Sequence, residues 1–235
     1  MTIDAQNLTY TELNELVRKA GKKFEIKNAL GQRFIAAGLG KATVDIYGVP
    51  GNALGAYMDG AELTVHGNAQ DAVGDTMNSG KIVVHGLCGD TVGYAMRGGE
   101  IYIKGNTGYR SGVHMKQYMD KKPVLVIGGK TGSFLGEYLA GGLIIVLGLC
   151  DQERIVGNFC GTGMHGGKII LRKTSYELSF PPQVHVEPAD LSDAKSYIEK
   201  YCAYFGVDPA PVLAREYIQL TPNSSNPYKE LYVAN

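Results

Sequence analysis

The sequence has no tryptophan, no surplus of charge of either sign and no long apolar run. Its 23 Lys and Arg residues balance 23 Asp and Glu residues, so the overall charge indicates neither a nucleic acid nor an anionic membrane as a partner. No apolar run approaches the roughly 18 residues of a membrane-spanning helix, and the polar N-terminus lacks the layout of a secretion signal. We therefore expect a cytoplasmic protein.

The four cysteines lack the spacing of a metal or cluster site. Cys88, Cys150, Cys160 and Cys202 contain no C-x-x-C pair. With 235 residues, the chain is long enough to bury a core without disulfide bonds. We interpret the cysteines as reduced, mostly buried thiols.

Glycine is the residue in excess, with 32 copies against a usual share of about 7%. An apolar-x-apolar-x-Gly pattern recurs six times, and four of the five steps between its closing glycines are 19 residues long. A second glycine follows each closing glycine by seven residues, or by nine in the last repeat. The predicted turn glycines are Gly48, Gly55, Gly67, Gly74, Gly86, Gly93, Gly105, Gly112, Gly129, Gly136, Gly148 and Gly157.

Aligned on this period, the repeats form aliphatic columns. Four residues before the closing glycine stand Val44, Leu63, Ile82, Ile101, Leu125 and Ile144, and two before it stand Ile46, Val65, Val84, Ile103, Ile127 and Val146. Residues between these columns alternate outward, as in strands with one wet face. Because a unit this small cannot bury its apolar side alone, successive units must stack as parallel strands.

These observations predict an all-β fold, a parallel β-helix with coils of 19 residues and glycine at crowded corners. The outward column Glu62, Lys81 and Glu100 alternates in sign, as stacked neighbours should. The alternative is an α/β protein with glycine-rich loops. However, no amphipathic helical pattern separates the strand candidates between residues 42 and 172.

Segments with helical patterns flank the repeats. Residues 10–20 have Thr9 and Glu12 as a capping box and Gly21 as a stop, and their apolar face holds Leu13, Leu16, Val17 and Ala20. Residues 190–206 carry a stripe of Leu191, Ala194, Ile198, Tyr201 and Phe205, and residues 211–220 carry a shorter one. Because the terminal strands of a solenoid invite aggregation, we expect helices to cap both ends.

The predicted organisation has three parts. Residues 1–38 form an N-terminal helical cap, residues 39–173 the β-helix, and residues 174–235 a C-terminal helical extension and tail. We expect the last residues, 221–235, to lie extended along another surface or another chain.

Several patterns resemble ligand sites without the required context. Residues 161–166 match the dinucleotide pattern G-x-G-x-x-G, but a strand pattern follows where a helix is needed. Residues 128–133, GGKTGS, resemble a phosphate loop, but Val124 stands where that loop needs its first glycine. His66 and His85 share an outward column without a third ligand. We therefore expect their rings to stack and to repel each other at low pH, without a metal site. A metal ion between the two rings stays an alternative. No column stacks three acids for glycan cleavage, and we assign no catalytic residue.

The irregular step of the period contains the insertion HMKQYMDKKP, residues 114–123. Interruptions of a regular solenoid are where binding usually resides. The candidate contacts with a partner or an anionic substrate are Arg110, His114, Lys116, Lys121 and Lys122. The equal alternative is a solvated loop, and a second interruption at residues 149–167 could belong to the same surface.

The repeats GDTMNSGKIVVHG, GYAMRGGEIYIKG and GEYLAGGLIIVLG resemble the GXGXG domain. This domain is the right-handed β-helix at the C-terminal end of the glutamate synthase large (alpha) subunit, and it also occurs in one of the subunits of formylmethanofuran dehydrogenase. Residues 31–80 are most similar to the glutamate synthase version, and the resemblance covers about residues 30–173. It implies a right-handed β-helix that aligns two reacting domains and carries no known catalytic residue.

In glutamate synthase those domains are a glutaminase, which frees ammonia with an N-terminal cysteine, and a flavin-containing synthase with an iron–sulfur cluster. Here Met1 and Thr2 stand where that cysteine would be. The resemblance therefore implies a non-catalytic scaffold subunit of a split glutamate synthase acting in glutamate biosynthesis. Its expected partners are a glutaminase-type amidotransferase subunit and an FMN-containing synthase subunit, which hold the FMN and the iron–sulfur cluster. The alternatives are a scaffold like the β-helical one in formylmethanofuran dehydrogenase and an unrelated binding solenoid.

Overall fold

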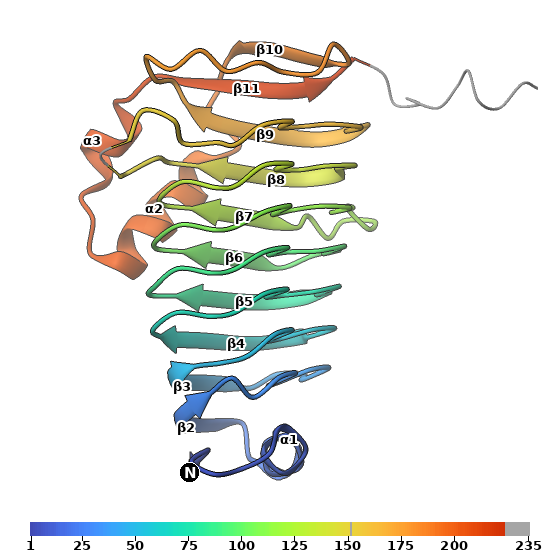
Figure 1. Ribbon diagram of the computed structural model, residues 1–235, viewed down its shortest axis with the longest axis vertical. Helices are drawn as coiled ribbons and strands as arrows, with labels where there is room; N and C mark the ends of the chain where they lie inside the picture. The colour runs from blue at the N-terminus through green and yellow to red at the C-terminus, as the bar shows by residue number, and fades with distance from the viewer. Residues whose placement is uncertain (151, 224–235) are drawn as a thin grey trace, which may run out of the picture.

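The computed structural model describes residues 1–150 and 152–223, and its strands stack into one elongated column (Figure 1). In this part of the chain, one sheet has the strand order β1-β2-β3-β4-β5-β6-β7-β8-β9-β11-β10. The strands are β1 (Thr2–Asp4), β2 (Lys23–Leu30), β3 (Thr43–Val49), β4 (Asp59–His66), β5 (Ser79–Val84), β6 (Glu100–Ile103), β7 (Val124–Ile127), β8 (Ala140–Val146), β9 (Gly166–Arg172), β10 (Val184–Pro188) and β11 (Tyr217–Pro222). The helices are α1 (Tyr10–Lys19), α2 (Lys195–Phe205) and α3 (Pro209–Leu213).

The fold is an all-β parallel solenoid, and it confirms the predicted register. Val44 pairs with Leu63, Leu63 with Ile82, and the column continues without a shift to Ile144. Every member of both aliphatic columns has no exposed surface. No helix separates β2 to β9 in the described residues, so the α/β alternative is wrong.

The solenoid extends one coil further at each end than the columns show. Phe24 of β2 pairs with Val44, and Ile169 of β9 pairs with Ile144. The segment expected as a helical cap, residues 1–38, therefore holds β1 and β2 as well as α1. The apolar pattern begins at β2, but Ala29 stands opposite Gly48, so the glycine that marks a coil is missing there.

The N-terminal helix forms as its sequence predicts. Thr9 and Glu12 make the capping box, with the Glu12 N–H donating to Thr9 Oγ1 and the Thr9 N–H to Glu12 Oε2. Leu13 and Val17 are buried in the solenoid core. Leu16 is exposed, although the pattern placed it on the apolar face.

The C-terminal segment differs from the predicted helical cap. The last parallel strand, β9, is followed in the sheet by β11 and then β10, both antiparallel to their neighbours. The helices α2 and α3 lie beside the stack rather than across its end (Figure 1). The part of the predicted extended tail at residues 224–235 lies outside the described residues.

Helix α2 lies beside the stack because the outward column of the sheet turns apolar along the chain. Thr64 of β4 is followed, coil by coil, by Val83, Tyr102, Val126, Ile145 and Ile170. Ile198 and Tyr201 of α2 pack against these residues in a second core. The outward face of the sheet, predicted to be solvent-exposed along all the strands, is therefore covered from β5 onward.

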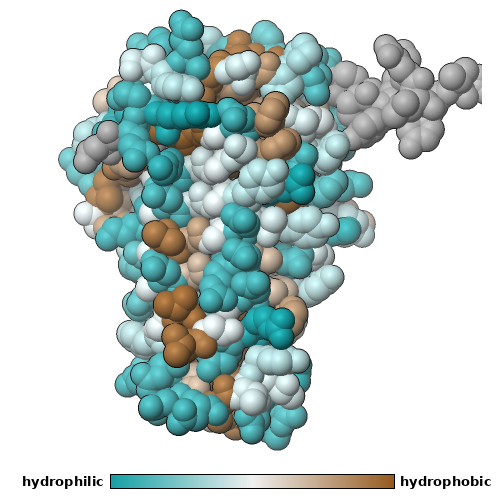
Figure 2. Space-filling view, in the orientation of Figure 1, coloured by the Kyte–Doolittle hydropathy of each residue, from teal (hydrophilic) through white to brown (hydrophobic). Residues whose placement is uncertain are grey.

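Beyond α2, apolar residues on the visible face form separate patches within a hydrophilic surface (Figure 2). Scattered exposed apolar residues are normal for folded proteins. In residues 1–150 and 152–223, no helix has the length and apolar character to cross a membrane.

Candidate functional site

The segments around the second glycines stack into a surface of their own, which we call the turn face. Its backbone bonds to the coils on both sides, since the Ala53 N–H donates to Asp71 O (2.9 Å) and the Gly55 N–H to Ile35 O (2.8 Å). Side-chain oxygens add a parallel ladder, in which Asp71 Oδ1 accepts the Asp90 N–H at 2.9 Å. The turn face comprises residues 52–59, 71–78, 90–97, 109–116, 133–140 and 158–165.

Large side chains occupy strained backbone positions in the later coils of the turn face. In the last coil the counterpart of the second glycines is Gly161, with φ of 74°, and not the predicted Gly157, because the Gly161 N–H bonds Leu135 O as the Gly136 N–H bonds Ser111 O. The residues two before these glycines have φ between 55° and 62°, whether they are Ala53, Ala72, Thr91, Arg110, Phe134 or Phe159. Such a conformation costs a non-glycine residue about 1 kcal/mol or more. Because alanine meets the backbone requirement in the earlier coils, folding does not explain the large side chains in the later ones.

Rings of successive coils stack along this part of the turn face. The ring centroids of Tyr109 and Phe134 are 5.2 Å apart, and those of Phe134 and Phe159 are 4.8 Å apart. We call these three residues the aromatic ladder. Tyr109 and Phe159 are exposed and Phe134 is half-buried. Exposed aromatic side chains supply large contact areas with few rotatable bonds, which suits a protein interface.

Arg110 is fixed on this ladder by a carboxylate and by two rings. Its Nε lies 2.9 Å from Oε2 of Glu137, whose side chain is only 9% exposed. Its Cζ lies 5.1 Å from the ring centroid of Tyr109 and 5.5 Å from that of Phe134. The guanidinium is therefore held against the ladder rather than free to reach a substrate.

Removing Arg110 leaves a mostly buried carboxylate without its cation. We expect Arg110→Met to lower the free energy of unfolding by about 2 kcal/mol, and Arg110→Met/Glu137→Gln to recover more than half of the loss. The matched control is Arg97→Met, because Arg97 lies exposed on the same face and forms no ion pair within the described residues. Urea denaturation of the four proteins measures the effect, and equal stability of Arg110→Met and wild type would contradict it.

A second set of rings lies one or two residues beyond the second glycine. His114 stacks on Tyr138 with ring centroids 5.1 Å apart and planes 11° apart, and Tyr94 meets His114 edge-on at 6.0 Å. Both His114 and Tyr138 have positive φ. His114 is thus part of the turn face and not of the loop that follows it.

The insertion forms a short loop that lies against neighbouring coils. Tyr118 and Lys121 exchange backbone hydrogen bonds at 3.2 and 3.0 Å, and Lys121 Nζ lies 3.8 Å from Asp59 Oδ1. Lys116 and Lys122 form no ion pair within the part of the chain that the structure describes.

The structure thus divides the five predicted contact residues between two places. Arg110 and His114 lie among stacked rings, and the three lysines lie in or next to the loop. Sequence reasoning missed Tyr109, Phe134 and Phe159. The sequence did contain a signal for them, because each lies two or three residues before a turn glycine of the same repeat that supplied the aliphatic columns.

Comparison with known proteins places this architecture in a family. The GXGXG motif family matches residues 4–225, which extends beyond the repeats at both ends. The chain belongs to the GXGXG motif family.

Two known proteins are similar to this GXGXG chain over nearly its whole length. "Uncharacterized protein MJ1350" of Methanocaldococcus jannaschii is 46% identical over 252 residues, which cover 99% of this chain and 96% of that protein. A chain of the formyltransferase/hydrolase complex (FhcABCD) from Methylorubrum extorquens, whose crystal structure is in complex with methylofuran, has a TM-score of 0.60. It is 21% identical, and the match covers 92% of this chain and 89% of that one, so this similarity shows the fold alone.

The two histidines singled out by the sequence of this GXGXG protein do stack. The His66 and His85 ring centroids are 5.5 Å apart, Tyr47 stacks on His66 at 4.4 Å, and Phe205 of α2 meets His85 edge-on at 5.2 Å. His66 Nε2 lies 2.8 Å from Asp45 Oδ1. Among the described residues, no three His, Cys, Asp or Glu side chains gather closely enough to hold a metal ion.

We expect the stability of this part of the fold to fall at acidic pH. Burial, and then the charges of His66 and Lys104, lower the pKa of His85 below its ordinary 6.5. A base whose pKa is lower in the folded state binds protons more weakly there, so its stability contribution is present above pH 6.5 and is lost as the pH falls through the folded pKa.

The variant His85→Gln should lose less stability at acidic pH than wild type does. The measurement is the free energy of unfolding above and below pH 6.5. The control is His185→Gln, at an exposed position on β10. An unchanged pH profile in His85→Gln would show that the group responsible lies elsewhere.

The cysteines are free, as predicted, and Cys88, Cys160 and Cys202 are buried. Burial raises the pKa of Cys160 to about 12 and also raises that of Cys88. Because thiolates are the reactive form, these two thiols are poor nucleophiles. The G-x-G-x-x-G segment runs directly into strand β9, which confirms the strand expected after it.

Proposed function

We propose that this protein is a non-catalytic scaffold subunit of a cytoplasmic split glutamate synthase. It holds a glutaminase-type amidotransferase subunit and an FMN-containing synthase subunit in alignment, so that ammonia passes from the first active site to the second. The partner subunits hold the FMN and the iron–sulfur cluster. Close placement of the two sites acts by raising the effective concentration of ammonia at the second one.

The observation that carries the proposal is the change of residue type along the turn face. Arg110 and the rings of Phe134 and Phe159 replace alanine and threonine in the later coils, at backbone positions that small residues also fill. Tyr, Phe and Arg are enriched in the cores of protein interfaces. The stacked coils present these side chains on a rigid frame, which suits a subunit that fixes the relative position of two partners.

The choice of glutamate synthase rests on residues 31–80 and their similarity to that enzyme's version of the domain, together with membership of the GXGXG motif family. A tagged full-length chain purified from its native source should bring down a glutaminase-type protein and a flavoprotein with an iron–sulfur spectrum. Adding the chain back to the separated partners should raise glutamine-dependent glutamate formation more than ammonia-dependent formation. Recovery of a formyl-transferring complex, or glutaminase activity in the isolated chain, would overturn the proposal.

A second candidate is a scaffold role in a formyl-transferring complex. The observation that favours it is the similarity of this chain, over 92% of its length, to one chain of a formyltransferase/hydrolase complex. The same purification separates the two candidates, since the partners then lack glutaminase activity and flavin.

A further inference from the structure

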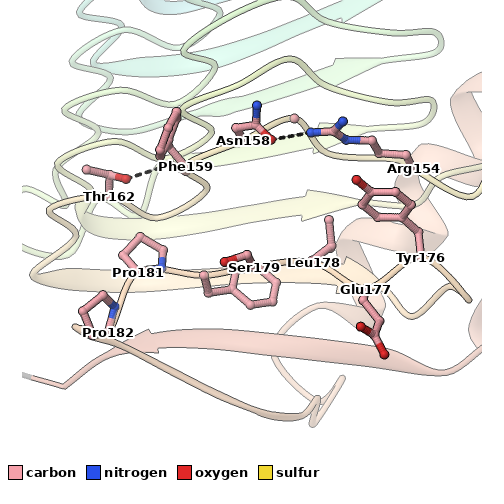
Figure 3. Close-up of a pocket in the computed structure, with 12 residues that line it drawn as sticks. Arg154, Asn158, Phe159, Thr162, Tyr176, Glu177, Leu178, Ser179, Pro181 and Pro182 are labelled. Carbon is pink, nitrogen blue, oxygen red and sulfur yellow. Dashed lines mark hydrogen bonds between the residues drawn. The ribbon is translucent and has the colours of Figure 1, made fainter.

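A cavity of about 530 Å³ opens at the end of the turn face, between residues 154–162 and the segment 176–182 (Figure 3). This volume lies within the range of ligand-binding pockets. Phe159, the last ring of the aromatic ladder, lines one side, and Tyr176 and Phe180 line the segment on the other. The cavity is therefore continuous with the candidate partner surface.

Arg154 is a fixed cation at this cavity without a carboxylate partner. Its Nη2 donates to Asn158 Oδ1, its Nε lies 3.4 Å from Val156 O, and its Cζ lies 5.2 Å from the Tyr176 ring centroid. It forms no ion pair within the described residues. Figure 3 shows the carboxylate of Glu177 directed away from the guanidinium. Arg154 thus retains N–H donors in a geometry that matches a carboxylate.

The segment that forms the far side of the cavity has unused backbone donors. The N–H groups of residues 177–180 make no hydrogen bond in the part of the chain that the structure describes. Pro181 and Pro182 follow, and they stiffen the segment at the cavity. A stretch of chain with free N–H and C=O groups beside apolar pockets is the arrangement that accepts an added extended peptide.

We propose that this cavity binds an extended peptide of a partner subunit that carries an Asp or Glu side chain. The carboxylate pairs with Arg154, and a neighbouring apolar side chain packs between Phe159 and Phe180. A nucleic acid fits less well, because the lining offers one cation, and Glu177 and the two prolines do not attract a phosphate backbone. The inference rests on the proposed function only in that a partner supplies the peptide.

A random-peptide phage library selected on the immobilised full-length chain tests this proposal. Enriched sequences should share an acidic residue next to an apolar one. A synthetic peptide of the enriched sequence should bind Arg154→Gln and Phe159→Ala at least tenfold more weakly than wild type, as should the same peptide with Gln or Asn in place of its acid. Arg97→Gln, at an exposed position outside the cavity, should bind as wild type does.

Each other outcome overturns the proposal. Enrichment without an acidic residue, or equal binding by Arg154→Gln and wild type, removes the role of the guanidinium. Displacement of the peptide by succinate at low concentration assigns the site to a small carboxylate. If a poly-uridine oligonucleotide binds and Arg154→Gln weakens its binding equally, the cavity is a nucleic-acid site. If a synthetic peptide of residues 224–235 binds with the same dependence on Arg154, the cavity binds a segment of this chain itself.

Circular dichroism of each variant separates a lost site from a lost fold. Because the selection uses the isolated chain, it can succeed when the native purification yields no glutamate synthase subunit, and it can fail when that purification succeeds. The proposed function and the peptide site are therefore tested independently.

Discussion

Gly80→Ala should lower the free energy of unfolding by about 4 kcal/mol, because two costs fall on the same residue. Gly80 lies in β5 with φ of 100°, where L-residues with a side chain are strained. A Cβ there would lie 2.2 Å from Ala61 O and 3.0 Å from Ala61 N in the preceding coil. These are backbone atoms of a paired strand, so relief requires the separation of β4 from β5. Urea denaturation measures the loss.

Gly93→Ala is the matched control. Gly93 also has positive φ, 70°, but the nearest atom to an added Cβ is Met115 Sδ at 3.6 Å, an ordinary contact. We therefore expect only the strain of the backbone conformation, about 1 kcal/mol. Equal losses in the two variants would mean that crowding between coils does not matter, and a native-like Gly80→Ala would contradict the stacked geometry itself.

The glycines of the repeat were predicted as one class, but the structure separates them by physical cause. Second glycines such as Gly55 and Gly93 have positive φ. The closing glycine Gly67 does not, and glycine is needed there because a Cβ would lie 2.7 Å from Gly48 O of the coil before it. The sequence shows that glycine recurs, whereas only the folded structure shows which of the two requirements applies at each position.

The register of the solenoid could be predicted because it depends on a short period repeated many times. Each step of 19 residues aligned Val44, Leu63 and Ile82 without any knowledge of long-range contacts, and these residues do pair. Strand β9 was expected after the G-x-G-x-x-G segment, whereas β2 escaped prediction. On the side away from β3, the pairing of β2 with β1 ends at Lys27, so in the described residues Ala29 has a paired strand on one side only. Ala29 can therefore stand opposite Gly48, and the motif that identifies a coil disappears.

The position of α2 could not be predicted from its own amphipathic stripe. The stripe shows that the helix buries one face, but not which surface covers it. The surface that α2 covers is set some hundred residues earlier in the chain. There the outward position held by Thr64 is taken by Val83 in the next coil and by Tyr102 in the one after. The rings of the candidate site were missed for a similar reason. They stand out only when the residue at one repeat position is compared from coil to coil, and no single motif marks them.

Tyr201→Ala should release α2 from the sheet with a loss of about 4 kcal/mol. Tyr201 is 1% exposed in the core between α2 and the strands, and its hydroxyl donates to Lys104 O at 3.0 Å. The ring end lies directly over Gly128, where an added Cβ would overlap the hydroxyl oxygen. The truncation therefore removes an aromatic ring from a site that has no side chain to fill the space.

The loss should be local, because coils of a solenoid are stabilised mainly by their neighbours. Hydrogen exchange should show faster exchange of α2 amides in Tyr201→Ala, while β3 and β4, which α2 does not cover, keep their protection. Tyr201→Phe keeps the ring and removes only the hydrogen bond, so it should cost about 1 kcal/mol and leave α2 protected. If the α2 amides exchanged as fast in Tyr201→Phe as in Tyr201→Ala, the hydroxyl and not the ring would hold the helix. If the whole sheet lost protection in Tyr201→Ala, α2 would be part of the cooperative core and not a covering layer added to a self-sufficient stack.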